Sequence, residues 1–151
     1  MVTATAVDDA GVMAALREVS DPEIPPVSIV DLGIVHSVDV RPGSIRVELL
    51  PTWVGCPALD AIRDAVDARL AAFDRPVEVS FTHAVPWASD RISGAGRDAL
   101  RRSGFAPPGE AACPYCGSAD VALENLFGPT QCRSLSYCRS CRQPFESMKT
   151  A

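Results

Sequence analysis

The sequence predicts an α+β fold followed by a small cysteine-rich module. Two segments that alternate apolar and polar residues around a tight turn predict a β-hairpin, and the segment 57–73 has a strong helical period. Five of the six cysteines lie at the C-terminal end of the chain. We therefore expect an α+β domain at residues 1–103, a Pro/Gly/Ala-rich linker at 104–112 and a separate cysteine module at 113–151.

The first helix is expected at residues 8–19, where apolar residues recur at helical spacing. These residues are Val12, Met13, Leu16 and Val19. Two acidic residues near the start suit the positive end of the helix dipole. The segment that follows, SDPEIPP, has three prolines that cannot continue a helix, so we expect the helix to end there.

Three strands are expected to form one small mixed sheet. Residues 33–40 and 44–52 alternate apolar and polar side chains, and the intervening Arg-Pro-Gly predicts a tight turn between antiparallel strands. Residues 77–82, VEVSFT, predict the third strand. Helices should cover one face of this sheet.

The strongest helical pattern in the chain begins at Pro57, a residue that suits the first position of a helix. Its apolar stripe consists of Leu59, Ile62, Val66 and Leu70. A shorter helix is expected at 93–103, and Gly104 is the type of residue that ends a helix.

Two Cys-x-x-Cys pairs predict a metal site in the C-terminal module. The pairs are Cys113 with Cys116 and Cys138 with Cys141, and 21 residues separate them, which is about the length of a hairpin. A module of about 35 residues buries too little apolar surface to fold alone, so a structural metal is expected. Four thiolates favour zinc, with iron or an iron–sulfur cluster as the alternative.

Cys132 fits neither pair. It could be an extra ligand for iron or a cluster, a buried thiol that packs like a small apolar residue, or a contact to a partner. Four ligands already close a structural site, so we expect the metal not to require Cys132. The second pair also lacks the glycine that follows the first, which makes it a less standard knuckle.

Cys56 and an acidic loop are the candidate functional residues of the first domain. Cys56 directly precedes the strongest helix, and the helix N-terminus should favour its thiolate; alternatively it is a buried cysteine that caps the helix. Asp21, Glu23 and Asp31 lie close in sequence. They could bind metal or exchange protons, or they could only form turns and keep the loop soluble.

Charge and motifs exclude several function classes. A net charge of −5 and a pI near 4.9 argue against general nucleic-acid binding. No apolar run approaches a membrane span and the N-terminus does not resemble a signal peptide, so we expect a cytoplasmic protein with reduced thiols. The sequence has no Gly-x-Ser-x-Gly, P-loop or dinucleotide motif, and we expect it not to be an enzyme.

Two motifs carry a family resemblance. SDPEIPPVSIVDLGIV and WVGCPALDAI resemble the iron–sulfur assembly domain of SufT-like proteins and of eukaryotic cytosolic iron–sulfur targeting factors, over residues 8–100. Together with WASDRISGAGRDALRRSGFAPP and the cysteine module, almost the whole chain resembles the PaaD (PaaJ) family, accessory subunits encoded with the phenylacetyl-CoA epoxidase. The resemblance implies an assembly domain plus a zinc ribbon. Cys56 matches the family's Gly-Cys-Pro position, and Asp21 and Glu23 match its acidic loop.

The resemblance also implies a function in aerobic phenylacetate catabolism. The expected role is maturation of a metal centre of the epoxidase system, with the iron–sulfur reductase component as the main partner and iron or a cluster held only transiently. Two alternatives stay open: a zinc-stapled adaptor without catalytic function, and an electron-transfer component that uses iron. Nucleic acid and membrane are not expected partners, and homodimer formation stays open.

Overall fold

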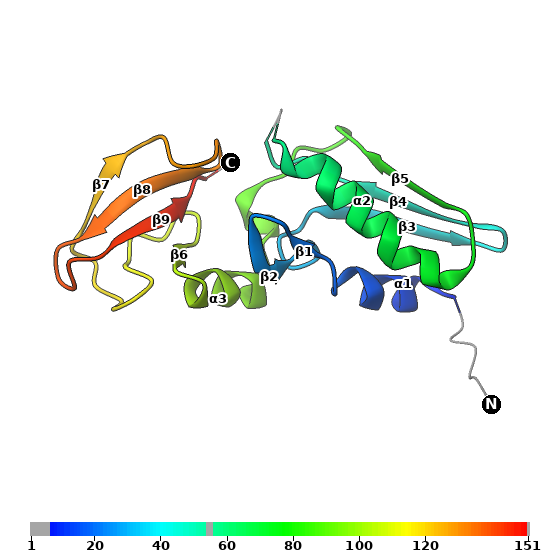
Figure 1. Cartoon of the computed structure of the whole chain (residues 1–151), viewed down its shortest axis with the longest axis horizontal. Coiled ribbons are helices and arrows are strands. Elements are labelled where there is room, and N and C mark those ends of the chain that lie inside the picture. The colour runs from blue at the N-terminus through cyan, green and yellow to red at the C-terminus, as the bar shows by residue number, and fades with distance from the viewer. Residues whose placement is uncertain (1–6, 54–55, 151) are drawn as a thin grey trace.

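The computed structural model describes residues 7–53 and 56–150 and has two modules joined end to end (Figure 1). The N-terminal module contains two helices against a small sheet, and the C-terminal module is a β-ribbon. A third helix lies between them. The α+β class predicted from the sequence is therefore confirmed.

Helix α1 spans Asp9–Leu16 and is shorter than the predicted helix at 8–19. The carboxylate of Asp8 accepts a hydrogen bond from the backbone N–H of Gly11 at 2.7 Å, so Asp8 caps the helix. Val12 and Leu16 are fully buried, which places the apolar side of α1 in the core of the module.

The sheet of the N-terminal module is mixed, as predicted. It has the order β3 (Val35–Arg41), β4 (Ser44–Leu49) and β5 (Val77–Phe81). β3 and β4 are antiparallel, whereas β4 and β5 are parallel. On β4 the alternate side chains Ile45, Val47 and Leu49 are fully buried, as expected for a sheet with one covered face.

Helix α2 (Ala58–Leu70) and the short helix η1 (Ala71–Phe73) connect β4 to β5. Ile62, Val66 and Leu70 of the predicted stripe are buried, but Leu59 is only partly buried and Ala58 takes its place. α1 and α2 lie side by side on one face of the sheet (Figure 1). The N-terminal end of α2 points towards the C-terminal module (Figure 1), and Cys56, which directly precedes α2, lines one cavity with Cys132 of that module.

The proline-rich segment after α1 forms two strands that the sequence did not predict. β1 (Ser20–Asp21) and β2 (Ile24–Ser28) pair with each other and belong to no larger sheet among the described residues. Proline is compatible with an edge strand because a missing N–H costs no ladder bond there. The two strands hold the acidic loop in a tight turn.

Helix α3 (Gly94–Arg102) follows the short helix η2 (Ser89–Arg91) and confirms the predicted helix at 93–103. The hydroxyl of Ser93 caps α3 by accepting the N–H of Gly96 at 3.0 Å. The helix packs against β2 on one side and against β6 of the C-terminal module on the other.

The C-terminal module is a four-stranded sheet with the order β6-β9-β8-β7. Its strands are β6 (Phe105–Ala106), β7 (Val121–Asn125), β8 (Arg133–Cys138) and β9 (Pro144–Met148). The segment 104–112, predicted as a linker, contains β6, which pairs with β9 in parallel. Residues 106–108 are buried, so this segment is an integral part of the ribbon.

Arg133 and Met148 join the two modules. Met148 is 7% exposed and packs into the core of the N-terminal module. The Arg133 guanidinium donates to the Glu23 carbonyl at 2.8 Å and to the Glu146 carboxylate at 3.2 Å, and it lies 4.8 Å from the Phe105 ring centroid. Four different elements of the chain therefore meet at one buried arginine.

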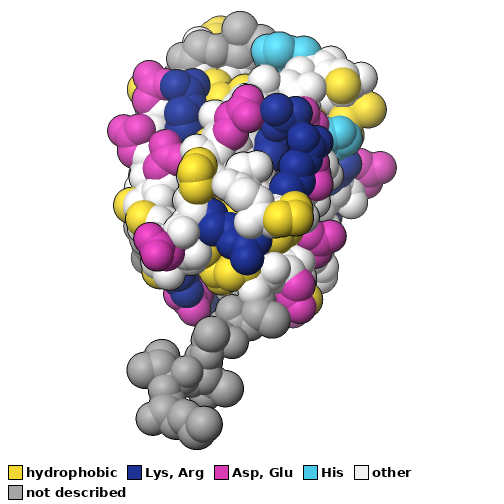
Figure 2. All heavy atoms as spheres, turned by 90° about the vertical axis from the view of Figure 1, so that its right-hand side faces the viewer, with side chains coloured by type: hydrophobic (Ala, Val, Ile, Leu, Met, Phe, Trp, Pro, Cys, Tyr) yellow, Lys and Arg dark blue, Asp and Glu magenta, His cyan; other side chains and the backbone are white. Residues whose placement is uncertain are grey.

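The end of the N-terminal module that faces away from the ribbon has a mixed surface. On the face seen in Figure 2, basic and acidic side chains are interspersed and hydrophobic side chains are scattered. Among the described residues, no helix is long and apolar enough to cross a membrane.

Candidate functional site

The four cysteines of the two pairs form one cluster in the ribbon. Their sulfur atoms all lie within 4.8 Å of one another. The Sγ atoms of Cys113 and Cys141 are 3.7 Å apart, and those of Cys116 and Cys138 are 3.6 Å apart. Sulfurs bonded at about 2.3 Å to one tetrahedral ion such as zinc would lie about 3.8 Å apart, which is close to these two distances, so the cluster suits a four-thiolate metal site.

Both knuckles have the same backbone turn despite their different sequences. Gly117 follows the first pair with φ +77°, and Arg142 follows the second pair with φ +60°. Backbone N–H groups point at the sulfurs: that of Tyr115 donates to Cys113 at 3.4 Å, and that of Cys141 donates to Cys138 at 3.5 Å. The missing glycine of the second knuckle therefore leaves the turn intact, and Arg142 takes the left-handed conformation.

Arg142→Gly is expected to stabilise the ribbon by about 0.5–1 kcal/mol. The left-handed conformation costs a non-glycine residue about 1–2 kcal/mol, and the greater freedom of glycine in the unfolded chain cancels part of that gain. Urea unfolding of the metal-loaded protein measures the change. Gly117→Ala is the matched test in the opposite direction: no atom would contact its new Cβ within 4 Å, so only backbone strain should destabilise it. Equal stability of all three proteins would contradict this account.

The thiols of the metal-free cluster do not ionise alike. The backbone N–H of Cys141 donates to Cys138 and is the main cause that lowers the Cys138 pKa to about 7, whereas burial is the main cause that raises the pKa of Cys141 to about 12. Four adjacent thiolates would repel one another, so a cation is needed to hold all four in the ionised form.

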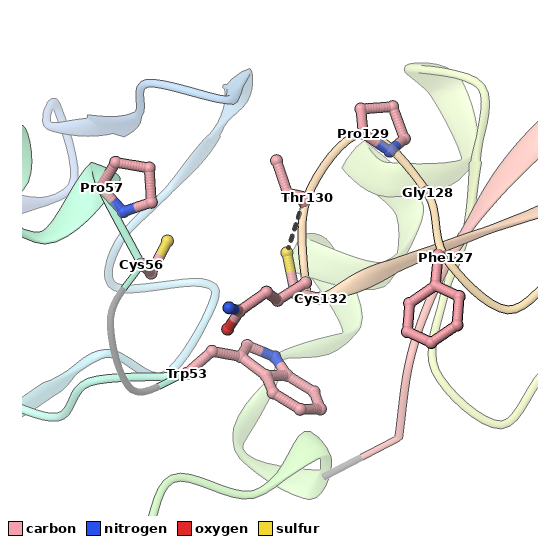
Figure 3. A pocket seen from close by; sticks show the side chains of 9 residues that line it. Trp53, Cys56, Pro57, Phe127, Gly128, Pro129, Thr130 and Cys132 are labelled. Atoms are coloured by element: carbon pink, nitrogen blue, oxygen red, sulfur yellow. Dashed lines mark hydrogen bonds between the residues drawn. The ribbon is translucent and has the colours of Figure 1, made fainter.

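Cys132 lies outside this cluster. Its thiol forms a hydrogen bond of 3.1 Å with the Thr130 hydroxyl, and its carbonyl accepts the N–H of Lys149 at 2.8 Å. Together with Cys56 it lines a cavity of about 330 Å³ between the two modules, with Trp53 and Phe127 also in the walls (Figure 3). The fifth cysteine of the C-terminal module therefore faces the other module.

Cys56 occupies a central position at the junction. It directly precedes α2 and lines three cavities, with volumes of about 330, 20 and 430 Å³. The smallest cavity is also lined by Asp21, Glu23 and Cys132, and the largest by His83. A partner or a small ligand can therefore reach this thiol from more than one side.

The three predicted acidic residues do not lie together in the structure. Asp21 and Glu23 lie at the junction, where the Asp21 carboxylate accepts the backbone N–H of Glu23 at 2.8 Å. Asp31 instead accepts a hydrogen bond from the Ser93 hydroxyl at 2.9 Å, and its carbonyl accepts the N–H of Ser93 at 2.8 Å. Asp31 thus anchors the start of α3, and only Asp21 and Glu23 accompany Cys56.

The pKa of the Cys56 thiol is raised, contrary to the expectation from the helix N-terminus. Partial burial is the largest cause, because it removes water from the thiolate. The backbone N–H of Ala58 lowers the pKa, but the nearby carboxylates of Glu23 and Asp21 raise it further. The tertiary surroundings therefore override the favourable effect of the helix, and Cys56 is a neutral thiol at pH 7.

Alkylation of Cys56 by iodoacetamide is expected to rise with pH through a midpoint above that of an ordinary cysteine. The thiolate is the reactive form, and a raised pKa keeps it scarce at neutral pH. Mass spectrometry of the Cys56 peptide measures the rate, with the ribbon cysteines held by metal. Glu23→Gln should lower the midpoint because it removes a repelling charge, whereas Glu124→Gln on exposed β7 should not. A midpoint below that of free cysteine would contradict the structural cause.

Comparison with known proteins identifies both modules. Residues 9–81 match the family described as "Iron-sulfur cluster assembly protein", and residues 98–149 match the "PaaD zinc beta ribbon domain". An Escherichia coli (strain K12) protein, named as one of the subunits of a "Putative 1,2-phenylacetyl-CoA epoxidase", is 34% identical over 149 residues, which cover 91% of this chain and 90% of that protein. The chain belongs to the PaaD family.

Other relatives match about three fifths of this PaaD-family chain. An "Iron-sulfur cluster carrier protein" of Mycobacterium tuberculosis (strain H37Rv) is 36% identical over 95 residues, which cover 62% of this chain but only 23% of that protein. A domain of unknown function from Bacillus anthracis has a TM-score of 0.56 and 29% identity, covering 60% of this chain and 89% of its own. A conserved hypothetical protein from Thermotoga maritima has a TM-score of 0.54 and 26% identity, covering 62% and 94%.

The sequence analysis did not single out two residues of the junction. Arg133 resembles an ordinary polar residue before a predicted strand, yet its side chain is 8% exposed and holds the modules of the PaaD-family chain together. Trp53 precedes Cys56 by three positions, and its position in the cavity wall depends on the fold of both modules. Sequence spacing could identify the metal knuckles but not these contacts.

Proposed function

We propose that this PaaD-family chain is an accessory factor that helps a multicomponent phenylacetyl-CoA epoxidase acquire an iron-containing centre, and that it is not itself a catalyst. The observation that carries the proposal is Cys56: a partly exposed thiol beside Asp21 and Glu23, at the mouth of several cavities, in an iron–sulfur assembly domain. Thiol and carboxylate groups are ligands for iron.

Membership in the PaaD family supports the choice of client. The Escherichia coli relative is named as a component of the epoxidase, and its similarity extends over both modules of this chain. The iron–sulfur reductase of such a system is the proposed client because its cluster must be built or inserted after synthesis. The place of action would be the cytoplasm, where these subunits are made.

The ribbon is proposed to hold one structural zinc ion through Cys113, Cys116, Cys138 and Cys141. Its apolar core is small, with Ala106 and Phe145 as the main apolar members beside the cysteines. The sulfur spacing fits zinc, and four protein ligands leave no open position for chemistry. Elemental analysis and the visible spectrum of anaerobically purified protein distinguish colourless zinc from rubredoxin-type iron or a cluster.

The test uses Cys56→Ser in cells that lack the native protein but express the complete epoxidase system. Serine keeps nearly the same volume, so the variant should fold. We expect slow growth on phenylacetate and a reductase with reduced iron content. Asp64→Asn, an exposed carboxylate on α2 that lines none of the three cavities, is the control and should leave both unchanged. Full growth with iron-loaded clients in the Cys56→Ser strain would refute the maturation function.

A second candidate function is a purely structural adaptor, and the surface of the ribbon favours it. Of the five exposed large hydrophobic side chains among the described residues, four lie in this module. They are Tyr115, Leu123, Leu126 and Phe127. Exposed apolar groups of this kind are typical of protein interfaces. If the adaptor function alone were correct, Cys56→Ser would be neutral, and a Leu123/Leu126 double alanine variant, which leaves the Cys56 cavities unchanged, would abolish binding to the epoxidase subunits.

A further inference from the structure

Two thiols and two carboxylates meet at the junction, apart from the four-cysteine cluster. Cys56 and Cys132 both line the cavity of about 330 Å³ and the smaller one of about 20 Å³, and Asp21 and Glu23 line the smaller one with them. Figure 3 shows Cys56 on one wall and Cys132 on the other. Each module thus supplies one sulfur, and the N-terminal module supplies the oxygens.

Hydrogen bonds hold Cys132 and the acidic loop in place at the junction. The Arg133 guanidinium binds the Glu23 carbonyl at 2.8 Å, which brings the neighbouring Cys132 to the acidic loop. The N–H of Lys149 fixes the Cys132 carbonyl at 2.8 Å. Asp21 uses one carboxylate oxygen for the N–H of Glu23, and its second oxygen can accept another ligand. The arrangement is built by contacts between the modules and not by the ribbon alone.

The chemistry of this group favours a cation. Two sulfurs with one or two carboxylate oxygens are a typical donor set for borderline divalent ions of the first transition row. Burial and the nearby carboxylates of Glu23 and Asp21 raise the pKa of Cys56 and so disfavour its thiolate in this place. A bound cation would reverse this effect and displace the thiol protons.

We propose that Cys56, Cys132 and Glu23, with Asp21 beside them, form a second metal site between the two modules that takes one first-row divalent cation, ferrous iron as cargo. The choice of iron as the cargo rests on the proposed function, whereas the site itself rests on the junction geometry. Trp53, Pro57 and Phe127 line the larger cavity beside this site.

The site is open in the present conformation. Among the described residues, only the ribbon cluster brings three or more donor atoms within 4.8 Å of one another. An ion at the junction must therefore bring the donor atoms of Cys56, Cys132 and Glu23 closer together than they lie here. An open site that closes on its ion suits a cargo that is later released, whereas the preformed ribbon cluster suits an ion that stays.

The experiment adds Co²⁺, and separately Fe²⁺, to the full chain under anaerobic conditions after the ribbon has been filled with zinc. We expect one further ion per chain, with thiolate-to-cobalt charge-transfer absorption in the near ultraviolet. Cys56→Ser and Cys132→Ser should each weaken this second binding at least about 100-fold, and Glu23→Gln about 10-fold. Glu124→Gln, an exposed carboxylate on β7, is the matched control and should bind like the native chain.

Zinc content and circular dichroism establish that each variant is folded with its ribbon intact. A native chain that takes up only the ribbon ion would overturn the proposal, as would a Cys132→Ser variant that keeps the second ion at native affinity. Failure of the proposed function is a separate result: there the second ion would bind normally in the test tube, while Cys56→Ser cells would still contain fully loaded epoxidase subunits.

Discussion

Cys138→Ser is expected to release the ribbon metal and to unfold residues 113–148, while the helices of the N-terminal module remain. Cys138 is fully buried, and its sulfur lies 3.6 Å from that of Cys116. The small core of the ribbon cannot stabilise four strands without an ion. In small zinc domains the metal contributes roughly 10 kcal/mol or more of apparent free energy, and this energy is coupled to folding.

Metal content after gel filtration and the amide spectrum of labelled protein measure both effects. Cys132→Ser is the control within the same module: its thiol is outside the cluster, so the zinc ion and the ribbon should be retained. Stoichiometric zinc in Cys138→Ser would mean that the ligand set is wrong. Loss of zinc in Cys132→Ser would also mean that the ligand set is wrong.

Arg133→Ala is expected to destabilise the protein by about 2–3 kcal/mol and to loosen the two modules. The substitution removes the hydrogen bonds to the Glu23 carbonyl and the Glu146 carboxylate, and it leaves partly buried acceptors without their cation. It also removes the contact with the Phe105 ring. Because both carboxylates are about a quarter exposed, water compensates part of the loss.

Urea unfolding compares this variant with Arg139→Ala, which removes an exposed ion pair with Asp120 and should change the stability by at most about 0.5 kcal/mol. Arg133→Lys should recover only part of the loss, since a lysine cannot donate in two directions from one planar group. Equal stability of the Arg133 and Arg139 alanine variants would show that the modules do not depend on this junction.

Local patterns were sufficient for most of the secondary structure. The hairpin of β3 and β4, helix α2 with Ile62 and Val66 inward, and helix α3 before Gly104 follow from periodicity and turn residues, which act over a few positions. The strands β1, β2 and β6 were missed for different reasons: β2 contains two prolines, β1 and β6 have only two residues each, and β6 becomes a strand only by pairing with the distant β9.

In the candidate site, too, local sequence patterns were sufficient for one part, and the tertiary structure decided the rest. Spacing alone determined the two cysteine pairs of the ribbon, because a Cys-x-x-Cys turn directs both sulfurs to one point whatever surrounds it. Only the tertiary structure decided that Cys132 faces Cys56, that Asp31 leaves the acidic group, and that Cys56 has a raised pKa. These properties arise from burial and from contacts between residues that are distant along the chain, such as the hydrogen bond from Arg133 to the Glu23 carbonyl that joins the ribbon to the acidic loop.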